Sequence, residues 1–200
     1  MHPNEVFHSD NRALCEALLH EIGFGMVYLT TPDGPCVAHT PFHSTRDGAV
    51  QFHLSNDNAL TQHLDGAEPL LLVNGPHAYV SPRWYEHAGK APTWNYVALE
   101  LDGRVRTMAP EGLADLLGAL AKRNESRLGG SNQWMPADMS PTDFAEMFGR
   151  ITGFEMEVRQ WRLTLKLSQN ISQEDRERVA DALGEEGSET LAQLMRTVGQ

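Results

Sequence analysis

The sequence predicts an α+β fold that is mainly β, with a small antiparallel β-barrel, peripheral helices and a helical pair at the C-terminal end. Three observations predict it. β-Prone runs closed by turn signals fill residues 24–102, helical patterns lie before and after them, and the strand–helix alternation of a parallel sheet is missing. With 200 residues, 40% of them hydrophobic, the chain can bury a core without disulfides or metals.

The first half of the chain is expected to form one helix followed by hairpins. Ser9 can cap the helix, whose apolar stripe has helical spacing and comprises Cys15, Leu18, Leu19 and Ile22. Asp-Gly turns at residues 32–34 and 46–48 separate β-prone runs at 24–30, 35–43 and 49–54, which is typical of antiparallel hairpins. A short helix at 58–64 is then expected to lead to strands at 68–74, 77–80 and 92–102.

The second half is expected to hold helices around one long strand. A helix begins at Pro110 and ends near Gly129, and its apolar stripe comprises Leu113, Leu116, Leu117 and Leu120. Another begins at Ser140-Pro141, a strand covers residues 155–168, and Ser172 and Ser188 cap two terminal helices. We therefore expect a barrel domain over residues 1–170 and a helical appendage over residues 171–200 that packs on the barrel or on a partner chain.

The charge balance argues against DNA and membrane partners. Lys and Arg number 16 and Asp and Glu 27, so the net charge is −11 with neutral histidines. DNA affinity comes mainly from cations that displace counterions from phosphates. The last predicted helix, residues 189–197, has Arg196 as its one cation, so direct DNA reading is doubtful. No apolar run approaches the ~18 residues of a membrane span.

The cysteine content and the N-terminal residues predict a cytoplasmic protein. Cys15 and Cys36 are the two cysteines, too few for a disulfide framework, and no signal-peptide pattern opens the chain. His39 and His43 suggest a metal pair, but Pro41 between them excludes a helix. On a strand four residues span about 13 Å, too far for both rings to bind one ion. No metal site is therefore expected.

Three segments concentrate rigid aromatic and polar side chains. They are residues 75–85 (Gly-Pro-His-Ala-Tyr-Val-Ser-Pro-Arg-Trp-Tyr), 91–97 (Ala-Pro-Thr-Trp-Asn-Tyr-Val) and 166–170 (Lys-Leu-Ser-Gln-Asn). Aromatic rings beside a few fixed polar groups are typical of a pocket for a flat heteroaromatic molecule. The same rings would also suit a barrel core or a dimer interface, and the pattern alone leaves both interpretations open.

The predicted strand at 159–168 adds a possible phosphate site. Trp161, Leu163, Leu165 and Leu167 alternate onto one face, and the other face carries two cations and two hydroxyls: Arg162, Lys166, Thr164 and Ser168. Such a face can hold a phosphate. It can equally be an edge strand protected by charge.

The order of these motifs resembles the PaiB-type family of FMN-binding negative transcriptional regulators. The resemblance includes the three segments above, the opening Met1-His2-Pro3 with Phe7, and the strand motif at residues 38–42 (Ala-His-Thr-Pro-Phe). It implies an FMN-binding split β-barrel that forms a homodimer, with the flavin, or another planar anionic small molecule, bound at the subunit interface.

Motif position and residue type suggest cofactor-binding roles for eleven residues. They are Thr40, Ser55 and Asn56 at the phosphate end, Trp84, Tyr85 and Trp94 beside the ring, His77, Ser81 and Asn95 as polar contacts, and Lys166 and Gln169 near the second chain. The family commonly has Ala-Arg-Ala-Asn-Pro where residues 54–58 read Leu-Ser-Asn-Asp-Asn. The missing arginine predicts weak or absent FMN binding unless Arg83, Arg162 or Lys166 replaces it.

Two functions follow from the resemblance. The first is a flavin-binding regulator that acts through its ligand or through a protein partner and does not read DNA directly. The alternative is a flavin-dependent oxidoreductase that uses a dissociable flavin, in which His77 would donate a proton.

Overall fold

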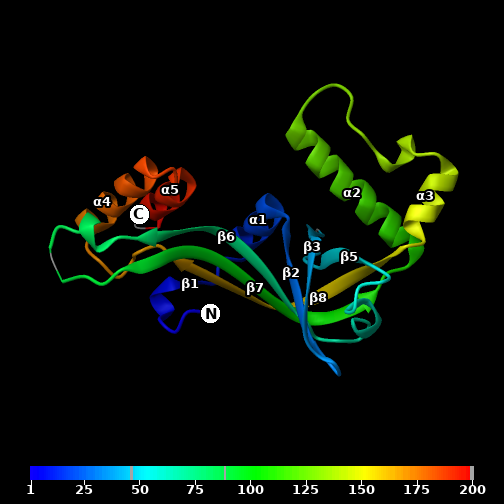
Figure 1. Ribbon diagram of the computed structural model, residues 1–200, viewed down its shortest axis with the longest axis horizontal. Coiled ribbons are helices and arrows are strands. Elements are labelled where there is room, and N and C mark those ends of the chain that lie inside the picture. The colour runs from blue at the N-terminus through cyan, green and yellow to red at the C-terminus, as the bar shows by residue number, and fades with distance from the viewer. Residues whose placement is uncertain (46, 88, 199–200) are drawn as a thin grey trace. The chain divides into compact units, whose positions relative to one another are not determined.

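The computed structural model describes residues 1–45, 47–87 and 89–198 (Figure 1). Its strands form one sheet in the order β3-β2-β6-β7-β8-β5-β4, with β1 paired to β8. The strands are β1 His8–Ser9, β2 Phe24–Thr31, β3 Gly34–Pro41, β4 His43–Ser44, β5 Val50–Ser55, β6 Leu70–Val80, β7 Thr93–Thr107 and β8 Ile151–Lys166. The helices are α1 Arg12–Ile22, α2 Pro110–Leu128, α3 Pro141–Phe148, α4 Gln173–Glu185 and α5 Glu189–Thr197. This order of elements confirms the predicted mainly antiparallel α+β architecture.

The chain divides into two compact units. Unit 1 comprises Met1–Cys15, Asn74–Glu100 and Arg162–Gln200, and unit 2 comprises Glu16–Val73 and Leu101–Trp161. The strands β6, β7 and β8 each contribute residues to both units. The division at residue 171 that the sequence suggests stays a prediction.

In unit 2 the predicted hairpins form. β2 pairs antiparallel with β3 from Phe24↔Pro41 to Thr31↔Gly34, and Gly34 closes the turn with a φ of 115°, which suits glycine. β4 pairs with β5, and β5 pairs with β8. The second predicted turn includes Arg46, which lies outside the described residues.

The core of unit 2 is built around three packed phenylalanines. Phe52 of β5 is directly opposite Phe154 of β8, with ring centroids 5.5 Å apart. Phe42 meets Phe52 edge to face at 5.9 Å, and none of the three is more than 1% exposed. Aromatic pairs in these geometries add to the stabilisation that burial provides.

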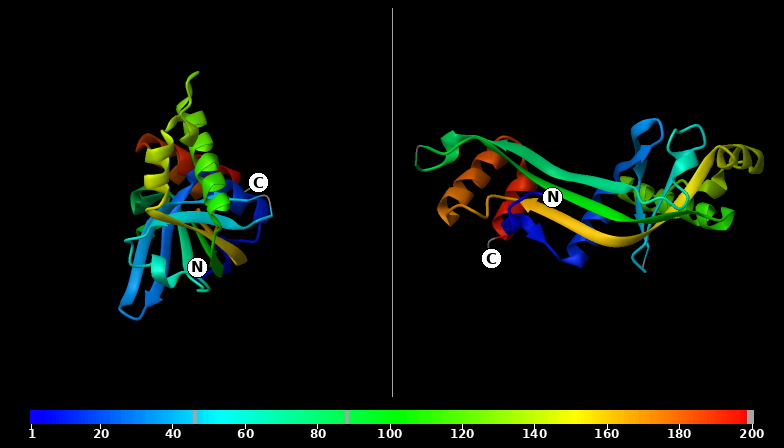
Figure 2. Two further views of the ribbon diagram at one scale, coloured as in Figure 1. Left: turned by 90° about the vertical axis from the view of Figure 1, so that its right-hand side faces the viewer. Right: turned by 90° about the horizontal axis from the view of Figure 1, so that it is seen from below.

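A helical pair follows β7 in unit 2. α2 buries Leu113, Leu116 and Leu120, as its leucine spacing predicts, and Phe148 and Ile151 pack against them. Gly129 ends α2 at a φ of 72°, and the Ser140 side chain caps α3 by accepting the Asp143 N–H. Both ends lie where the sequence predicts them. Figure 2 shows α2 and α3 from two further directions.

Several boundaries differ from the sequence prediction. The cap of α1 is Asn11, whose Oδ1 accepts the Leu14 N–H at 3.0 Å, while Ser9 is paired in β1. Residues 58–64 form only the 3-10 turn Thr61–His63. β6 runs through Gly75-Pro76 without a break, and β7 and β8 extend to Thr107 and back to Ile151. Strand length here is set by pairing with neighbours, which local sequence does not encode.

Two arginines of α2 hold the junction of α1 and β2 in unit 2. Arg123 donates from Nη1 to the Phe42 carbonyl at 2.7 Å and from Nη2 to the Gly23 carbonyl at 3.2 Å. Arg127 donates from Nη2 to the His20 carbonyl at 3.0 Å. Cations suit these positions because the C-terminal carbonyls of a helix carry partial negative charge.

Two half-buried histidines near this junction predict that the protein becomes less stable as the pH falls. Burial lowers the pKa of His43 and His53, and the charges of Arg123 and His20 lower that of His43 further. An unfolded histidine has a pKa of about 6.5, so below that pH the unfolded chain binds more protons than the folded chain and stability declines. We expect the midpoint of thermal unfolding to fall from pH 7 to pH 5. The double variant His43→Gln, His53→Gln should flatten this dependence, and an unchanged slope would contradict the assignment.

Candidate functional site

The three chemically dense segments meet at one cavity inside unit 1. The cavity has a volume of about 330 Å³. Tyr85 from the first segment, Ala91, Thr93 and Asn95 from the second, and Lys166, Ser168 and Asn170 from the third line it. Its wall is completed by His2, Asn4, Phe7, Lys90 and Ile171. The volume lies at the lower end of the ~300–1,000 Å³ typical of small-molecule sites.

The cavity is positively charged. The chain has three lysines, at 90, 122 and 166, and Lys90 and Lys166 both line the cavity, whereas no carboxylate occurs among its described lining residues. Lys166 Nζ donates to Thr93 Oγ1 at 2.6 Å and to the Trp94 carbonyl at 2.5 Å. Burial lowers the pKa of the Lys166 ammonium group. In a chain with a net charge of −11, this concentration of cations suits an anionic ligand.

Each cavity lysine lies over an aromatic ring. Lys166 Nζ is 5.9 Å from the centroid of the Phe7 ring, and Lys90 Nζ is 6.0 Å from that of Tyr85. A ring face attracts an ammonium group without neutralising its charge. Both cations therefore remain available to a ligand.

A buried amide and a strained serine lie beside the lysines. Asn95 Nδ2 donates to Ser168 Oγ at 2.9 Å and to the Met195 sulfur of α5 at 3.3 Å. Ser168 Oγ lies 3.2 Å from Asn95 Oδ1, to which it also donates, and Ser168 is 4% exposed. Among the described residues other than glycine, Ser168 alone has a positive φ, 64°. Strain of this kind is enriched at functional sites.

The Ser168 conformation gives a testable stability difference. Ser168→Ala removes the hydroxyl that pairs with Asn95 and keeps the strain, so we expect a loss of ~1–3 kcal/mol in the free energy of unfolding. Ser168→Gly loses the same bond but removes a strain of ~1 kcal/mol, so it should be the more stable of the two. Urea denaturation of both variants measures the difference. An alanine variant that is at least as stable as the glycine variant would contradict the strained conformation of Ser168.

The C-terminal helix α4 contacts the chain beside the cavity. Asp175 in the first turn of α4 accepts the Glu86 N–H on Oδ1 at 2.9 Å, and Arg178 pairs with the Glu86 carboxylate at 3.3 Å. Glu86 directly follows Tyr85, and burial together with the Asp175 charge raises the pKa of the Tyr85 phenol. The backbone directly after Tyr85 is thus bonded to α4.

Two of the predicted residues join an exposed aromatic cluster of unit 1. We define this cluster as His77, Tyr79 and Trp94. The Trp94 indole N–H donates to His77 Nδ1 at 3.2 Å, and the centroids of the Trp94 and Tyr79 rings are 5.9 Å apart. Tyr79 is 46% and Trp94 49% exposed, which is unusual for large aromatic side chains and typical of contact surfaces.

The remaining predicted residues make contacts within the chain. In unit 1, Ser81 caps the 3-10 turn Pro82–Trp84, Trp84 is half-buried there, and Gln169 bonds the backbone of Leu165 and Leu167.

In unit 2, Thr40 Oγ1 donates to the His53 carbonyl at 2.7 Å, Asn56 bonds Gly149 and Thr152, and Ser55 Oγ accepts the Asp57 N–H. The polar atoms of Thr40 and Asn56 already have partners. The assignment of Thr40, Ser55 and Asn56 to a phosphate stays a prediction.

Sequence reasoning did not identify several cavity residues. His2, Asn4 and Phe7 line the cavity although they precede the first helix by sequence. β1 brings them there by pairing His8 with Thr164 and Ser9 with Leu163. The signal in the sequence is the opening motif that resembles the PaiB-type family. This motif indicates the family, but it does not show that these side chains line the cavity.

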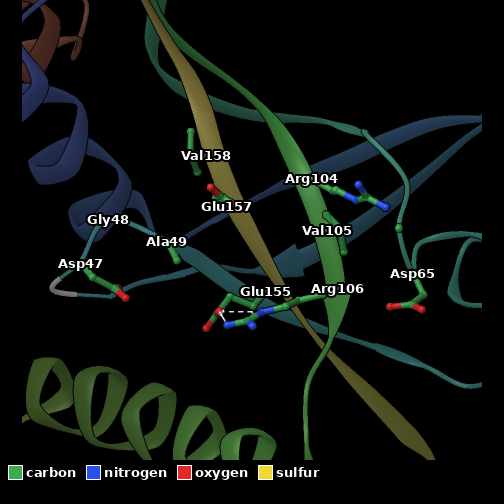
Figure 3. A pocket seen from close by; sticks show the side chains of 11 residues that line it. Asp47, Gly48, Ala49, Asp65, Arg104, Val105, Arg106, Glu155, Glu157 and Val158 are labelled. Carbon is green, nitrogen blue, oxygen red and sulfur yellow. Dashed lines mark hydrogen bonds and ion pairs between the residues drawn. The ribbon is translucent and has the colours of Figure 1, made fainter.

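Unit 2 has a larger hollow of about 520 Å³ (Figure 3). It is lined by four carboxylates and two arginines: Asp47, Asp65, Glu155, Glu157, Arg104 and Arg106. Arg106 pairs with Glu155, and Asp65 accepts the Thr107 N–H at 2.8 Å. Its excess of carboxylates makes this hollow unsuitable for an anionic ligand.

Comparison with solved structures identifies the fold. The chain is similar to the FAD- and heme-binding protein from Mycobacterium smegmatis, with a TM-score of 0.63 and 19% identity over 84% of this chain and 78% of that one. It is also similar to the flavocytochrome Anf3 from Azotobacter vinelandii, with a TM-score of 0.62 and 16% identity over 88% and 77%. The fold is that of the flavin-binding split-barrel proteins, as the sequence predicts.

The family is established by sequence. Residues 1–160 match the family described as "Putative FMN-binding domain", and the chain belongs to it. It is 28% identical over 184 residues to "Protease synthase and sporulation protein PAI 2" of Bacillus subtilis, covering 88% of this chain and 87% of that protein. An uncharacterized protein of Emericella nidulans is 29% identical over 151 residues, which is 66% of this chain and 60% of that protein.

The cavity side chains fit the cofactor that the family implies. Ammonium groups suit a phosphate, and the neutral amides and hydroxyls suit a polyol or the edge of a flavin ring. Within the parts of the chain that the structure describes, no helix is long and apolar enough to cross a membrane.

Proposed function

We propose that this protein binds FMN in the cavity of unit 1 and acts as a flavin-dependent regulator. The observation that carries the proposal is that three separate segments of the sequence each contribute residues to the wall of one cation-bearing cavity. Its family and the similarity of its fold to flavin-binding proteins support the same conclusion.

The proposed roles follow the chemistry of each side chain. Of the predicted residues, Tyr85, Asn95 and Lys166 line the cavity. There Tyr85 would flank the flavin, Asn95 would offer a polar contact and Lys166 would close the site. The roles assigned to His77, Ser81, Trp84, Trp94 and Gln169, which are not among the lining residues, stay predictions from their motifs. Bound FMN would supply hydride or single-electron transfer. The protein's own part is to bind and orient the flavin.

The exposed aromatic cluster supports a homodimer. We propose that a second copy of the chain covers His77, Tyr79 and Trp94 and completes the flavin site. Tyr79→Glu would place a charge in that interface, so we expect the variant to be monomeric by size-exclusion chromatography with light scattering. Trp134→Glu is the matched control, because Trp134 of unit 2 is 45% exposed, close to the 46% of Tyr79. A dimeric Tyr79 variant, or a monomeric wild-type protein, would contradict the interface.

Regulation is proposed to act through the ligand or a protein partner. Arg196, the one cation of α5, pairs with Asp181 at 2.7 Å and with Glu177 at 3.6 Å. A recognition helix needs free cations for phosphates and donors for base edges, and the one cation of α5 is engaged by two carboxylates. A gel-shift assay at moderate salt should therefore show no specific duplex binding.

Flavin titration tests the central proposal. We expect the purified protein to quench FMN fluorescence in a saturable way and to unfold at a higher temperature when FMN is added, since a ligand that binds only the folded state stabilises it. A protein that neither carries nor takes up FMN would refute the proposal. Steady NAD(P)H consumption that requires added FMN would instead identify the oxidoreductase function.

A further inference from the structure

We propose that Lys166 and Lys90 bind the phosphate of the ligand, so that the cavity of unit 1 selects phosphorylated over unphosphorylated flavin. The flavin identity rests on the function proposed above, whereas the phosphate site itself rests on the cavity. In this proposal the two lysines supply the cationic contact to the phosphate, because the arginine common in the family is missing from residues 54–58.

The charge distribution is the first argument. Two of the three lysines of an acidic chain line one cavity that contains no carboxylate among its described wall residues. A half-buried ammonium group without a carboxylate is costly to desolvate. A bound phosphate dianion would offset that cost with charge-assisted hydrogen bonds.

The hydrogen-bond capacity of the lysines is the second argument. An ammonium group has three N–H donors. Lys166 uses two of them on Thr93 Oγ1 and the Trp94 carbonyl, both at fixed positions of β7. These bonds orient the group and leave a third donor for a ligand. Lys90 lies over the Tyr85 ring, on the same cavity.

The other cations of unit 1 that could replace the missing arginine are engaged elsewhere. Arg162 pairs through Nε with Glu100 Oε2 at 3.3 Å. Arg83 Nε donates to Ser81 Oγ at 3.4 Å within its own turn. Neither residue lines the cavity. Among Arg83, Arg162 and Lys166, the structure therefore favours Lys166.

The neutral residues of the wall indicate what carries the phosphate. Asn4, Thr93 and Asn170 offer amides and a hydroxyl around the lysines, whereas Asn95 and Ser168 are bonded to each other. Such groups both donate and accept hydrogen bonds and so match the hydroxyls of a polyol chain. The ligand class is a polyol phosphate, of which the ribityl phosphate of FMN is an example.

Binding measurements with three probes test the site. FMN, riboflavin and glycerol 3-phosphate are titrated by calorimetry into the wild-type protein and into Lys90→Met, Lys166→Met and Lys122→Met. Lys122 is the matched control, since it lies in unit 2 on α2. Lys90 is exposed, so its variant should fold even if Lys166→Met does not.

We expect FMN to bind at least about 10-fold more tightly than riboflavin, because a hydrogen bond to a charged group contributes ~1.5–3 kcal/mol. Lys90→Met and Lys166→Met should each reduce that preference about 10-fold and weaken glycerol 3-phosphate binding. Lys122→Met should change neither the preference nor the affinities. Added salt should weaken FMN binding more than riboflavin binding.

The other outcomes separate the phosphate site from the proposed function. Equal affinity for FMN and riboflavin, or a preference that persists in both cavity variants, would overturn the phosphate site while leaving flavin binding intact. Lysine-dependent binding of glycerol 3-phosphate without any flavin binding would support the phosphate site and refute the proposed function. Binding of none of the three probes would refute both.

Discussion

Phe52→Ala is expected to lower the free energy of unfolding by about 3–5 kcal/mol, which is among the largest effects that a single substitution can have in this protein. Phe52 is 0% exposed and lies between Phe42 and Phe154, with centroid distances of 5.9 and 5.5 Å. Truncation removes both ring contacts and leaves a cavity that the paired strands β5 and β8 cannot close. Urea denaturation followed by circular dichroism measures the loss.

Phe52→Leu is the control for this variant. Leucine keeps most of the buried volume, so we expect a loss of less than ~1.5 kcal/mol if the site repacks. If the alanine variant lost no more stability than the leucine variant, the three phenylalanines could not be the centre of the unit 2 core.

Gly103→Ala is expected to destabilise the protein by up to ~3 kcal/mol, the upper end of the range for overpacking. A Cβ at Gly103 in β7 would lie 2.0 Å from the Glu157 carbonyl oxygen and 2.9 Å from the Val158 Cα of β8. These are backbone atoms, which no side-chain rotation can move away. Figure 3 shows the two strands running past each other where Arg104 and Glu157 are labelled.

Gly118→Ala serves as the matched control for Gly103→Ala. No atom lies within 4 Å of a Cβ built at Gly118, in the interior of α2. Alanine is preferred over glycine inside a helix, so this variant should gain roughly 0.5–1 kcal/mol. Opposite signs for the two substitutions, measured in the same urea experiment, are the expected result, and a neutral Gly103→Ala would mean that the strands do not approach so closely.

The proposed phosphate site depends on where the lysines lie. The chain as a whole has a net charge of −11, yet Lys90 and Lys166 both lie on the wall of the unit 1 cavity. A phosphate contact made by ammonium groups is a point-charge interaction, without the two-pronged geometry of an arginine. The affinity for a phosphorylated ligand should therefore respond strongly to salt.

Much of the fold follows from local sequence. The Asp-Gly turn at residues 33–34 predicts the β2–β3 hairpin, the leucine spacing predicts α2, and Ser140 and Ser172 cap α3 and α4 through their side chains. The motif order identifies the family. These features rest on interactions within a few residues, and they can be recognised in the sequence.

Other contacts of the fold and of the candidate site join residues that are far apart in the sequence. The Asn56 amide bonds Gly149 and Thr152, and Asn95 bonds Ser168. The Phe7 ring lies against the Lys166 ammonium group. No local sequence pattern predicts these contacts, because their partners are far apart along the chain. By itself the sequence determined the elements, the family and the residues rich in chemistry. Only the tertiary structure decided which of those polar groups are already bonded within the chain and which face a cavity, because that depends on partners that folding alone brings together.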